Sequence, residues 1–196
     1  QENFNISEYN IKINHLTCIN CKNLAVSSKL GYIKFYKNED FSSHSMITPT
    51  SDFENIKSTN LNEIFDENKI EQCDLLKLDC EGAEYEILLN TSNEVYKKIN
   101  QIFLEYHIDN NEGLLEKLIT KLKENDFYIK KIKNTEYLGY VFAKKWLNYN
   151  KHNWKGFIMK IGIVGAKGFV GSALCRNIHQ NDEIIKISKN NYNDEK

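Results

Sequence analysis

Four carboxylates lie within eight positions, directly after an apolar segment of the sequence. They belong to the stretch KLDCEGAEYE, residues 77–86, which continues the run DLLKLD that is typical of a buried strand. In open parallel α/β sheets, ligands bind beyond the carboxyl ends of the strands. Asp79 and Glu81 stand at such an end, before a glycine, Gly82, that permits a tight turn. We therefore predict that Asp79 and Glu81 lie at the edge of a sheet where a ligand binds.

The other two acids, Glu84 and Glu86, allow a simpler interpretation, because they fall in the first turn of the helix predicted after the strand. Acidic side chains interact favourably there with the helix dipole, by about 0.3–1 kcal/mol. Lys77 shares a strand face with Asp79 through the two-residue period of a strand. A lysine inside an apolar strand needs a partner, so we predict an ion pair with Asp79 or another acid of this edge.

A second apolar segment, IFLEYH at 102–107, also ends in polar residues. If its strand neighbours the first one, Glu105 and His107 lie along the same edge as the first pair of acids. An isolated histidine at a strand end is more often structural. Opposite two acids, however, His107 becomes a candidate general base.

The sequence CINC at 18–21, with His15 nearby, suggests a metal site. However, it lies in a strand-like run, where residues three apart point to opposite faces. The sequence holds no second Cys-x-x-Cys to complete a zinc site, so we predict no metal. The five cysteines are an odd number, which favours reduced thiols and a cytoplasmic location.

Composition indicates a globular protein with a sizeable core. The chain has 196 residues, of which 41% are hydrophobic and 27% charged, and its formal net charge is −1. This charge gives no reason to expect nucleic acid as a partner. No apolar run of the sequence approaches the ~20 residues that span a bilayer, so we predict no membrane association. The oligomeric state is not specified by the sequence.

Strands alternate with helices along most of the chain, which predicts a mostly parallel sheet covered on both faces. The predicted elements are, in order, a helix at 4–14, strands at 18–26 and 32–36, a polar loop or lid at 37–58, a short helix at 60–68, a strand at 74–79, helices at 83–90 and 92–99, a strand at 102–107 and an amphipathic helix at 114–122. The segments 127–133 and 137–145 predict an antiparallel hairpin at the edge of the sheet. The first domain is thus expected over 1–147, with a linker at 148–158.

A different pattern begins at Met159, with MKIGIVGAKGFVGSALCRNI. A short buried strand precedes Gly165, Gly168 and Gly171, and an amphipathic helix and the strand DEIIKIS follow. Glycines at such a turn let the backbone approach a pyrophosphate that faces the helix N-terminus. The stretch resembles the opening of nucleotide-sugar epimerases and reductases of the extended short-chain dehydrogenase family, which implies NAD(P) binding over 159–196.

The end of the next strand bears on which dinucleotide would bind. Ser188 and Lys189 stand where an NAD enzyme usually carries an acid, and a lysine can pair with the 2′-phosphate of NADP. Alternatively, the three glycines merely pack a helix on a strand. The resemblance stops at Lys196 after one β-α-β start, and no catalytic Tyr-x-x-x-Lys follows, so we expect no oxidoreductase activity.

The pattern STNLNEIF…CDLLKLDCEGAEYEILL…IFLEYH resembles the FkbM-type methyltransferases, a branch of the class I S-adenosylmethionine-dependent family. The likeness runs from about residue 4 to residue 145, and DLLKLDCEGAEYEIL is its most specific element. It implies methyl transfer from S-adenosylmethionine to a hydroxyl of a small-molecule or glycan acceptor. The positions that it implies are Asp79 and Glu81 beside the methyl-transfer centre, Lys77 and Gly82 in the same motif, Glu105 and His107 on the acceptor side, and Ala25, Val26 and Ser27 at the adenine pocket.

Members of that family begin with a strand, a glycine-rich loop and a second strand that ends in an acid for the ribose, and Gln1 would stand just after that acid. The glycines of the first domain are too widely separated to form the loop: Gly31, Gly82, Gly113, Gly139 and Gly156. The resemblance therefore implies a Rossmann-like class I methyltransferase sheet that lacks its first strands, followed by the first β-α-β of a second Rossmann unit. Met159 would suit a second gene read in one frame with the first, or a true fusion. A non-catalytic truncated fragment, or an α/β domain whose edge acids bind nothing, stays open as an alternative.

Overall fold

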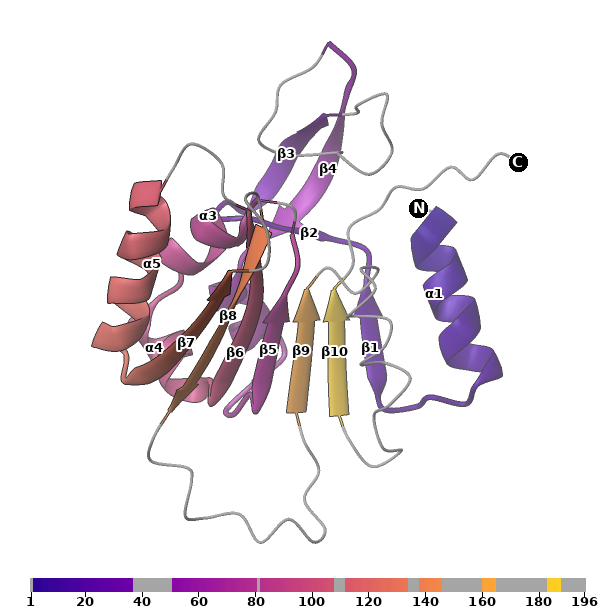
Figure 1. The fold of residues 1–196 in the computed structure, drawn as a ribbon. Helices are drawn as coiled ribbons and strands as arrows, with labels where there is room; N and C mark the ends of the chain where they lie inside the picture. Colours follow the sequence, from indigo (N-terminus) through magenta and orange to yellow (C-terminus); the bar gives the residue numbers. More distant parts are fainter. Residues whose placement is uncertain are drawn as a thin grey trace, which may run out of the picture.

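The computed structural model describes residues 2–36, 51–80, 82–107, 112–133, 138–145, 160–164 and 183–187. In these ranges a seven-stranded sheet forms the body of the molecule, and a three-stranded sheet accompanies it. Figure 1 shows the smaller sheet rising beyond the arrowheads of the central strands, at the carboxyl edge of the larger one. The carboxyl edge is therefore where the two sheets meet.

The large sheet is parallel over most of its width. Its strands lie in the order β1 (Ile19–Lys22), β10 (Glu183–Ile187), β9 (Lys160–Val164), β5 (Leu75–Leu78), β6 (Gln101–His107), β8 (Leu138–Lys145) and β7 (Phe127–Lys133). All neighbours from β1 to β6 are parallel, whereas β8 is antiparallel to both β6 and β7. The structure thus confirms the predicted mostly parallel sheet with an antiparallel hairpin at one edge.

The strand β5 has the composition that a central parallel strand requires. Its sequence is LLKL, and Leu76, Lys77 and Leu78 are all buried. A parallel strand covered on both faces is apolar throughout rather than alternating, so the lysine is the exception that needs an explanation. In β6, Ile102, Leu104 and the intervening half-buried residues form a second run of the same kind.

Two strands in the centre of the sheet correct the predicted fold. The sequence predicted a sheet that lacks its first strands and a separate second Rossmann unit over 159–196. The structure instead places β9 between β5 and β10, and β10 between β9 and β1. The physical reason is that a central strand needs hydrogen-bonding partners on both edges, and the apolar strand KIGIV supplies one for β5. The boundaries 1–147, 148–158 and 159–196 stay a prediction.

The small sheet corrects another expectation. Its strands lie in the order β2 (Ala25–Val26), β4 (Phe53–Thr59) and β3 (Gly31–Tyr36), with β2 parallel and β3 antiparallel to β4. The sequence predicted a polar loop over 37–58, but β4 occupies 53–59. Polar side chains such as Glu54 and Lys57 are exposed, while Ser58 is buried, so pairing with two strands overrides the low apolar content.

The described helices are α1 (Glu2–Ile13), α2 (Leu61–Glu67), α3 (Glu84–Leu89), α4 (Asn93–Lys98) and α5 (Glu112–Glu124). Figure 1 shows α3, α4 and α5 together beside the β6–β8–β7 part of the large sheet, and α1 beside β1. None of the helices in the described ranges is long and apolar enough to cross a membrane.

Local side chains explain where the short helices begin. Asn60 accepts a hydrogen bond from the Glu63 backbone N–H at 2.9 Å, which caps α2. Ser92 accepts one from the Val95 N–H at 3.3 Å, which confirms its predicted role as the cap of α4. The helix α3 ends at Asn90 as predicted, although the φ of Asn90 is −98° and not left-handed.

The core lies between the helices and the large sheet. The predicted amphipathic helix is confirmed in α5, whose Leu118 and Leu122 are fully buried. Tyr106 is also fully buried, and it stands directly opposite Gly139 across the antiparallel β6–β8 pair. A Cβ atom at Gly139 would overlap the Tyr106 ring, so this glycine makes the space that the ring occupies.

Candidate functional site

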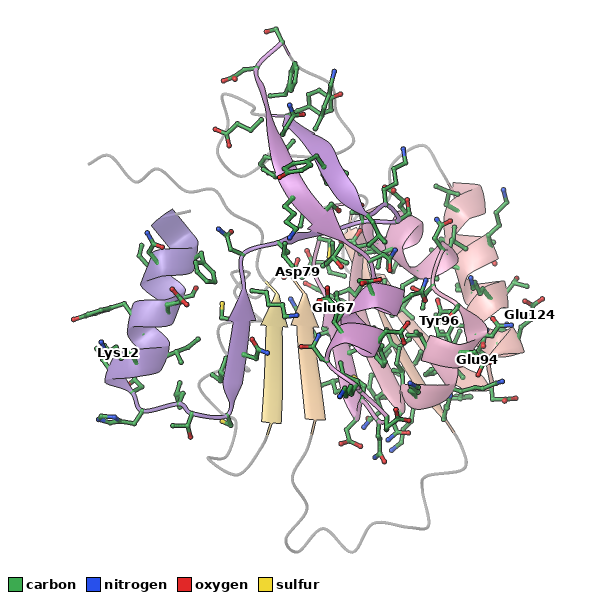
Figure 2. The ribbon with its side chains drawn as sticks, turned by 180° about the vertical axis from the view of Figure 1, so that it is seen from behind. Lys12, Glu67, Asp79, Glu94, Tyr96 and Glu124 are labelled. Carbon is green, nitrogen blue, oxygen red and sulfur yellow. The ribbon has the colours of Figure 1, made fainter. Side chains whose placement is uncertain are left out.

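The end of β5 carries a buried ion pair. The Nζ atom of Lys77 donates to Oδ2 of Asp79 at 2.5 Å, and the two side chains are 1% and 8% exposed. This confirms the predicted pairing of Lys77 with an acid of this edge. Each charge on its own would be costly to bury, so the pair holds because each side chain compensates the other. Figure 2 shows Asp79 at the end of the large sheet, near the base of the small one.

The segment between β5 and α3 turns sharply. Gly82 has a φ of +94°, a left-handed conformation that side chains with a Cβ rarely adopt. This agrees with the tight turn predicted from the sequence. Glu81, the second predicted acid of this edge, lies outside the described residues. The roles of Gly82 and Glu81 toward a ligand stay predictions.

The two acids assigned to the helix start do more than interact with a dipole. Glu84 is fully buried in the first turn of α3, and its Oε1 atom accepts a hydrogen bond from the Cys80 N–H at 2.7 Å. Glu86 accepts hydrogen bonds from both the backbone N–H and the hydroxyl of Ser28. Glu84 thus closes the turn after β5, and Glu86 fastens α3 to the segment after β2.

The predicted adenine-pocket residues lie where that fastened segment begins. Ala25, Val26 and Ser27 are 4%, 6% and 2% exposed. The Ser27 N–H donates to the Thr59 carbonyl at 2.9 Å, and its hydroxyl lies 2.8 Å from that of Ser58. These contacts tie the three residues into the small sheet at the carboxyl edge, where their predicted role toward adenine stays a prediction.

On β6, Glu105 lies close to a tyrosine that the sequence did not single out. Glu105 and Tyr140 stand directly opposite each other in the β6–β8 register, and the Tyr140 hydroxyl donates to the Glu105 carboxylate. The Tyr140 ring stacks on Phe103, with ring centroids 5.6 Å apart. Nothing in the spacing of the sequence signals this contact, because the two residues meet only through antiparallel pairing.

The electrostatic surroundings of Tyr140 connect the two strand ends. Its pKa is raised, first by burial, then by the charge and the hydrogen bond of Glu105, and also by the charge of Asp79. Asp79 therefore acts on the same group as Glu105, as the predicted common edge requires. His107 ends β6 opposite Leu138, but its side chain lies outside the described residues.

The strand beside β5 is β9, and the structure describes it up to its last residue, Val164. Val164, the end of β9, stands opposite Leu78, the end of β5. Gly165 follows Val164 in the sequence. The predicted cofactor residues that lie outside the described ranges are Gly165, Gly168, Gly171, Ser188 and Lys189. Their roles toward NAD(P) stay predictions.

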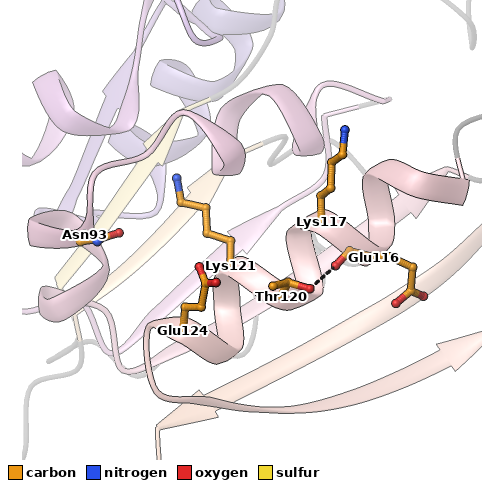
Figure 3. A pocket seen from close by; sticks show the side chains of 6 residues that line it. All are labelled: Asn93, Glu116, Lys117, Thr120, Lys121 and Glu124. Atoms are coloured by element: carbon orange, nitrogen blue, oxygen red, sulfur yellow. Dashed lines mark hydrogen bonds between the residues drawn. The ribbon is translucent and has the colours of Figure 1, made fainter.

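In the described ranges, no group of three or more His, Cys, Asp or Glu side chains could hold a metal ion, and Cys18 and Cys21 are half-buried thiols. A shallow groove of about 510 Å³ lies between α4 and α5 (Figure 3). Its lining residues are Asn93, Glu116, Lys117, Thr120, Lys121 and Glu124.

The polar groups of that groove serve the helices. The Nζ atom of Lys121 donates to the carbonyls of Leu89 at 2.6 Å and Thr91 at 2.8 Å, at the C-terminal end of α3. Burial lowers the pKa of Lys121, and the charge of Glu124 opposes that shift. Thr120 donates to the Glu116 carbonyl within α5. The carboxyl edge is therefore the better candidate site.

Comparison with known proteins gives one match. The family model described as the methyltransferase FkbM domain matches residues 1–140. That range contains β5, β6 and Tyr140, and it ends before β9 and β10. No curated protein and no solved structure matches the chain.

Proposed function

The chain belongs to the FkbM methyltransferase family, and from this premise we propose that it transfers a methyl group from S-adenosylmethionine to a hydroxyl of a sugar, a glycan or a related small molecule. The observation that carries the proposal is the pairing of Lys77 with Asp79 at the end of β5. It fixes one carboxylate at the edge where Glu105 and Tyr140 also meet. Ligands of parallel sheets bind at this edge.

The reaction is a displacement in which the acceptor oxygen forms a bond to the methyl carbon while the carbon–sulfur bond breaks. When bound, S-adenosylmethionine supplies that methyl group on a positively charged sulfur. Asp79 would stabilise positive charge at the edge, and its contact with Lys77 holds its orientation. Glu105 would accept the proton that the acceptor hydroxyl loses, with Tyr140 fixing the carboxylate.

A sugar acceptor is supported by the exposed face of the small sheet. Tyr32, Lys34 and Tyr36 alternate along β3 and so share one face, with Phe53 opposite Tyr36. Tyr32 is 74% exposed and Phe53 41%, and Lys34 Nζ lies 4.4 Å from the Phe53 ring centroid. The C–H face of a pyranose packs on such rings, while its hydroxyls bond to polar neighbours. This face belongs to the sheet that rises from the carboxyl edge (Figure 1).

The direct test measures transfer of labelled methyl groups from S-adenosylmethionine to a panel of sugars and nucleotide sugars, with the full chain. Asp79→Asn should lower the rate by about 10²-fold or more if the carboxylate stabilises charge in the transition state. Glu94→Gln is the matched control, because Glu94 is 77% exposed and pairs only with Lys97 among the ion pairs of the described residues. Equal rates for Asp79→Asn and the unchanged protein would refute the assignment.

The alternatives predict different binding. A non-catalytic fragment would bind neither S-adenosylmethionine nor any acceptor. A dinucleotide-binding protein of the kind implied by residues 159–196 would bind NADPH in calorimetry and would show no binding of S-adenosylmethionine. The family match supports the methyltransferase over both, because it covers residues 1–140 and does not extend to the glycine motif at 165–171.

A further inference from the structure

The exposed face of the small sheet carries rings and cations in a fixed order. Alternate residues of a strand share a face, and so do residues that stand directly opposite each other on paired strands. The opposite pairs on this face of β3 and β4 are Tyr32 with Lys57, Lys34 with Asn55, and Tyr36 with Phe53. One ring therefore lies at the end where β4 also pairs with β2, the two lysines lie beside it and beyond it, and two rings lie at the far end.

The other face of the same strands explains why this one is open. Phe35 is 1% exposed, and Ile33 and its opposite residue Ile56 are half-buried. The two strands thus bury their apolar side chains on that side, whereas Lys34 and Lys57 are exposed on the ring-bearing side. Exposed aromatic rings among polar side chains are typical of a surface that binds a ligand.

The charge of the exposed face is positive. Lys34 and Lys57 are diagonal neighbours across the antiparallel pair, a separation of about 7–8 Å, so one small anion can reach both. None of the six positions of this face carries a carboxylate, because Glu54 stands opposite Phe35 on the other face. No ion pair between described residues involves either lysine. The face is therefore complementary to a compact ligand with two negative charges.

Aromatic rings flank these two cations. The Phe53 ring meets the Tyr36 ring edge to face, with centroids 6.1 Å apart, and Lys34 Nζ lies 4.4 Å from the Phe53 centroid. Tyr32 and Tyr36 are four residues apart on β3, which places them about 13–14 Å apart along the strand. Aromatic side chains stack on any nucleobase and also pack on the C–H face of a sugar. The order of ring, cations and ring corresponds to base, diphosphate and sugar.

We propose that the exposed face of the small sheet binds a nucleoside diphosphate sugar. The diphosphate lies between Lys34 and Lys57, and the base and the sugar pack on the rings at the two ends. A nucleic acid or an anionic membrane surface would need a longer run of basic side chains, and the chain has a net charge of −1. The sugar acceptor then reaches the enzyme as its nucleoside diphosphate derivative. This last step rests on the proposed function, whereas the binding itself does not.

Calorimetric titration of the full chain with UDP-glucose, GDP-mannose and dTDP-glucose tests the binding, with methyl glucoside as the uncharged comparison. At least one nucleotide sugar should bind more tightly than the glucoside by about 10-fold or more, and Lys34→Gln and Lys57→Gln should each raise its Kd by about 10-fold. Lys123→Gln is the matched control, because Lys123 is exposed on α5. Absence of binding by all three nucleotide sugars, or equal Kd values in the lysine variants and the unchanged chain, would overturn the proposal.

The flanking ring has its own test. Tyr32→Ala should raise the Kd of the same nucleotide sugar by about 10-fold, whereas Tyr32→Phe keeps the ring and should bind as the unchanged chain does. Tyr9→Ala, at a 63% exposed position on α1, is the control for loss of an exposed ring. Equal binding by Tyr32→Ala and Tyr32→Phe would contradict rings on both sides of the diphosphate. A dimer that dissociates in Tyr32→Ala, without nucleotide-sugar binding, would show that this face binds a second copy instead.

Methylation assays separate this inference from the proposed function. If both hold, Lys34→Gln should raise KM for the nucleotide sugar and leave kcat and KM for S-adenosylmethionine unchanged. Nucleotide-sugar binding that depends on the lysines, without any methyl transfer, would leave this inference standing and remove the proposed function. Methylation of methyl glucoside with the same KM as the nucleotide sugars would leave the proposed function standing and remove this inference.

Discussion

Lys77 and Asp79 form an ion pair with 2.5 Å between Nζ and Oδ2, and both side chains are almost completely buried. One residue of the pair lies in β5 and the other directly follows it, so no other element is needed to bring the two charges together. A buried pair of this kind is weak evidence for stability by itself, because two well-packed apolar side chains can do as well. Because the pair lies at the carboxyl edge, a role in orienting Asp79 explains its presence better than a contribution to stability does.

Removing one partner of the pair should be costly. Lys77→Met leaves the Asp79 carboxylate buried without its cation, so we expect the free energy of unfolding to fall by about 3–5 kcal/mol. Lys97→Met, which breaks the exposed pair with Glu94, should change it by less than about 1 kcal/mol. Urea unfolding followed by circular dichroism measures both. The double variant Lys77→Met with Asp79→Leu should regain most of the loss, and no recovery would contradict this account.

Tyr140 should influence turnover through Glu105. Tyr140→Phe keeps the ring that stacks on Phe103 but removes the hydrogen bond donated to the Glu105 carboxylate. We expect kcat for methylation to fall by about 10-fold, because the free energy of one hydrogen bond to a charged group corresponds to about that change in rate. KM for S-adenosylmethionine should change little. Tyr128→Phe, at a 60% exposed position, is the control. An unchanged kcat in Tyr140→Phe would place Glu105 outside the reaction.

Gly139 should tolerate no side chain. Gly139→Ala places a Cβ against the buried Tyr106 ring, and we expect a loss of about 1–3 kcal/mol in the free energy of unfolding from overpacking. Gly113→Ala is the matched control, because a Cβ at that position in α5 meets nothing within 4 Å. There alanine should stabilise the helix by about 0.5–1 kcal/mol. Thermal unfolding of the two variants should therefore shift in opposite directions.

Stability should fall at alkaline pH because of Tyr96. Burial raises its pKa above the ordinary value of 10.0, and its hydroxyl donates to the Leu88 carbonyl at 2.7 Å. A tyrosine whose pKa is raised by folding contributes fully below pH 10.0, and the contribution is lost as the pH rises through the folded-state value. Urea unfolding at pH 8 and pH 11 should therefore show a steeper loss in the unchanged chain than in Tyr96→Phe.

The control for this pH effect is Tyr9→Phe, at a 63% exposed position on α1. It should follow the unchanged chain at both pH values. If Tyr96→Phe lost as much stability between pH 8 and pH 11 as the unchanged chain does, ionisation of Tyr96 would not be the cause.

Patterns within one segment were predictable from the sequence. The buried strand that ends at Asp79, the amphipathic helix α5 and the hairpin of β7 and β8 follow from periodicity and from the order of apolar runs. The pairing of Lys77 with Asp79 follows from the two-residue period of a strand. Membership of the methyltransferase family was indicated by the strand-end motif and is shown by the match over residues 1–140.

Contacts between distant segments were not predictable in this way. Glu86 and Ser28 are 58 positions apart and meet only because α3 packs beside the segment that follows β2. Glu105 and Tyr140 meet through the antiparallel register of β6 and β8, which no local pattern specifies. The strand β4 has little apolar content and exists because β2 and β3 pair with it.

The sequence by itself determined which segments become strands and helices, and that carboxylates stand where a buried strand ends, because side-chain periodicity and local caps act over a few residues. The tertiary structure decided which strands become neighbours, because strand pairing depends on edges that are left open elsewhere in the chain. The sequence predicted a sheet without its centre, and only the fold placed β9 and β10 between β1 and β5. That placement sets Val164 opposite Leu78 and so defines the edge at which Asp79 stands.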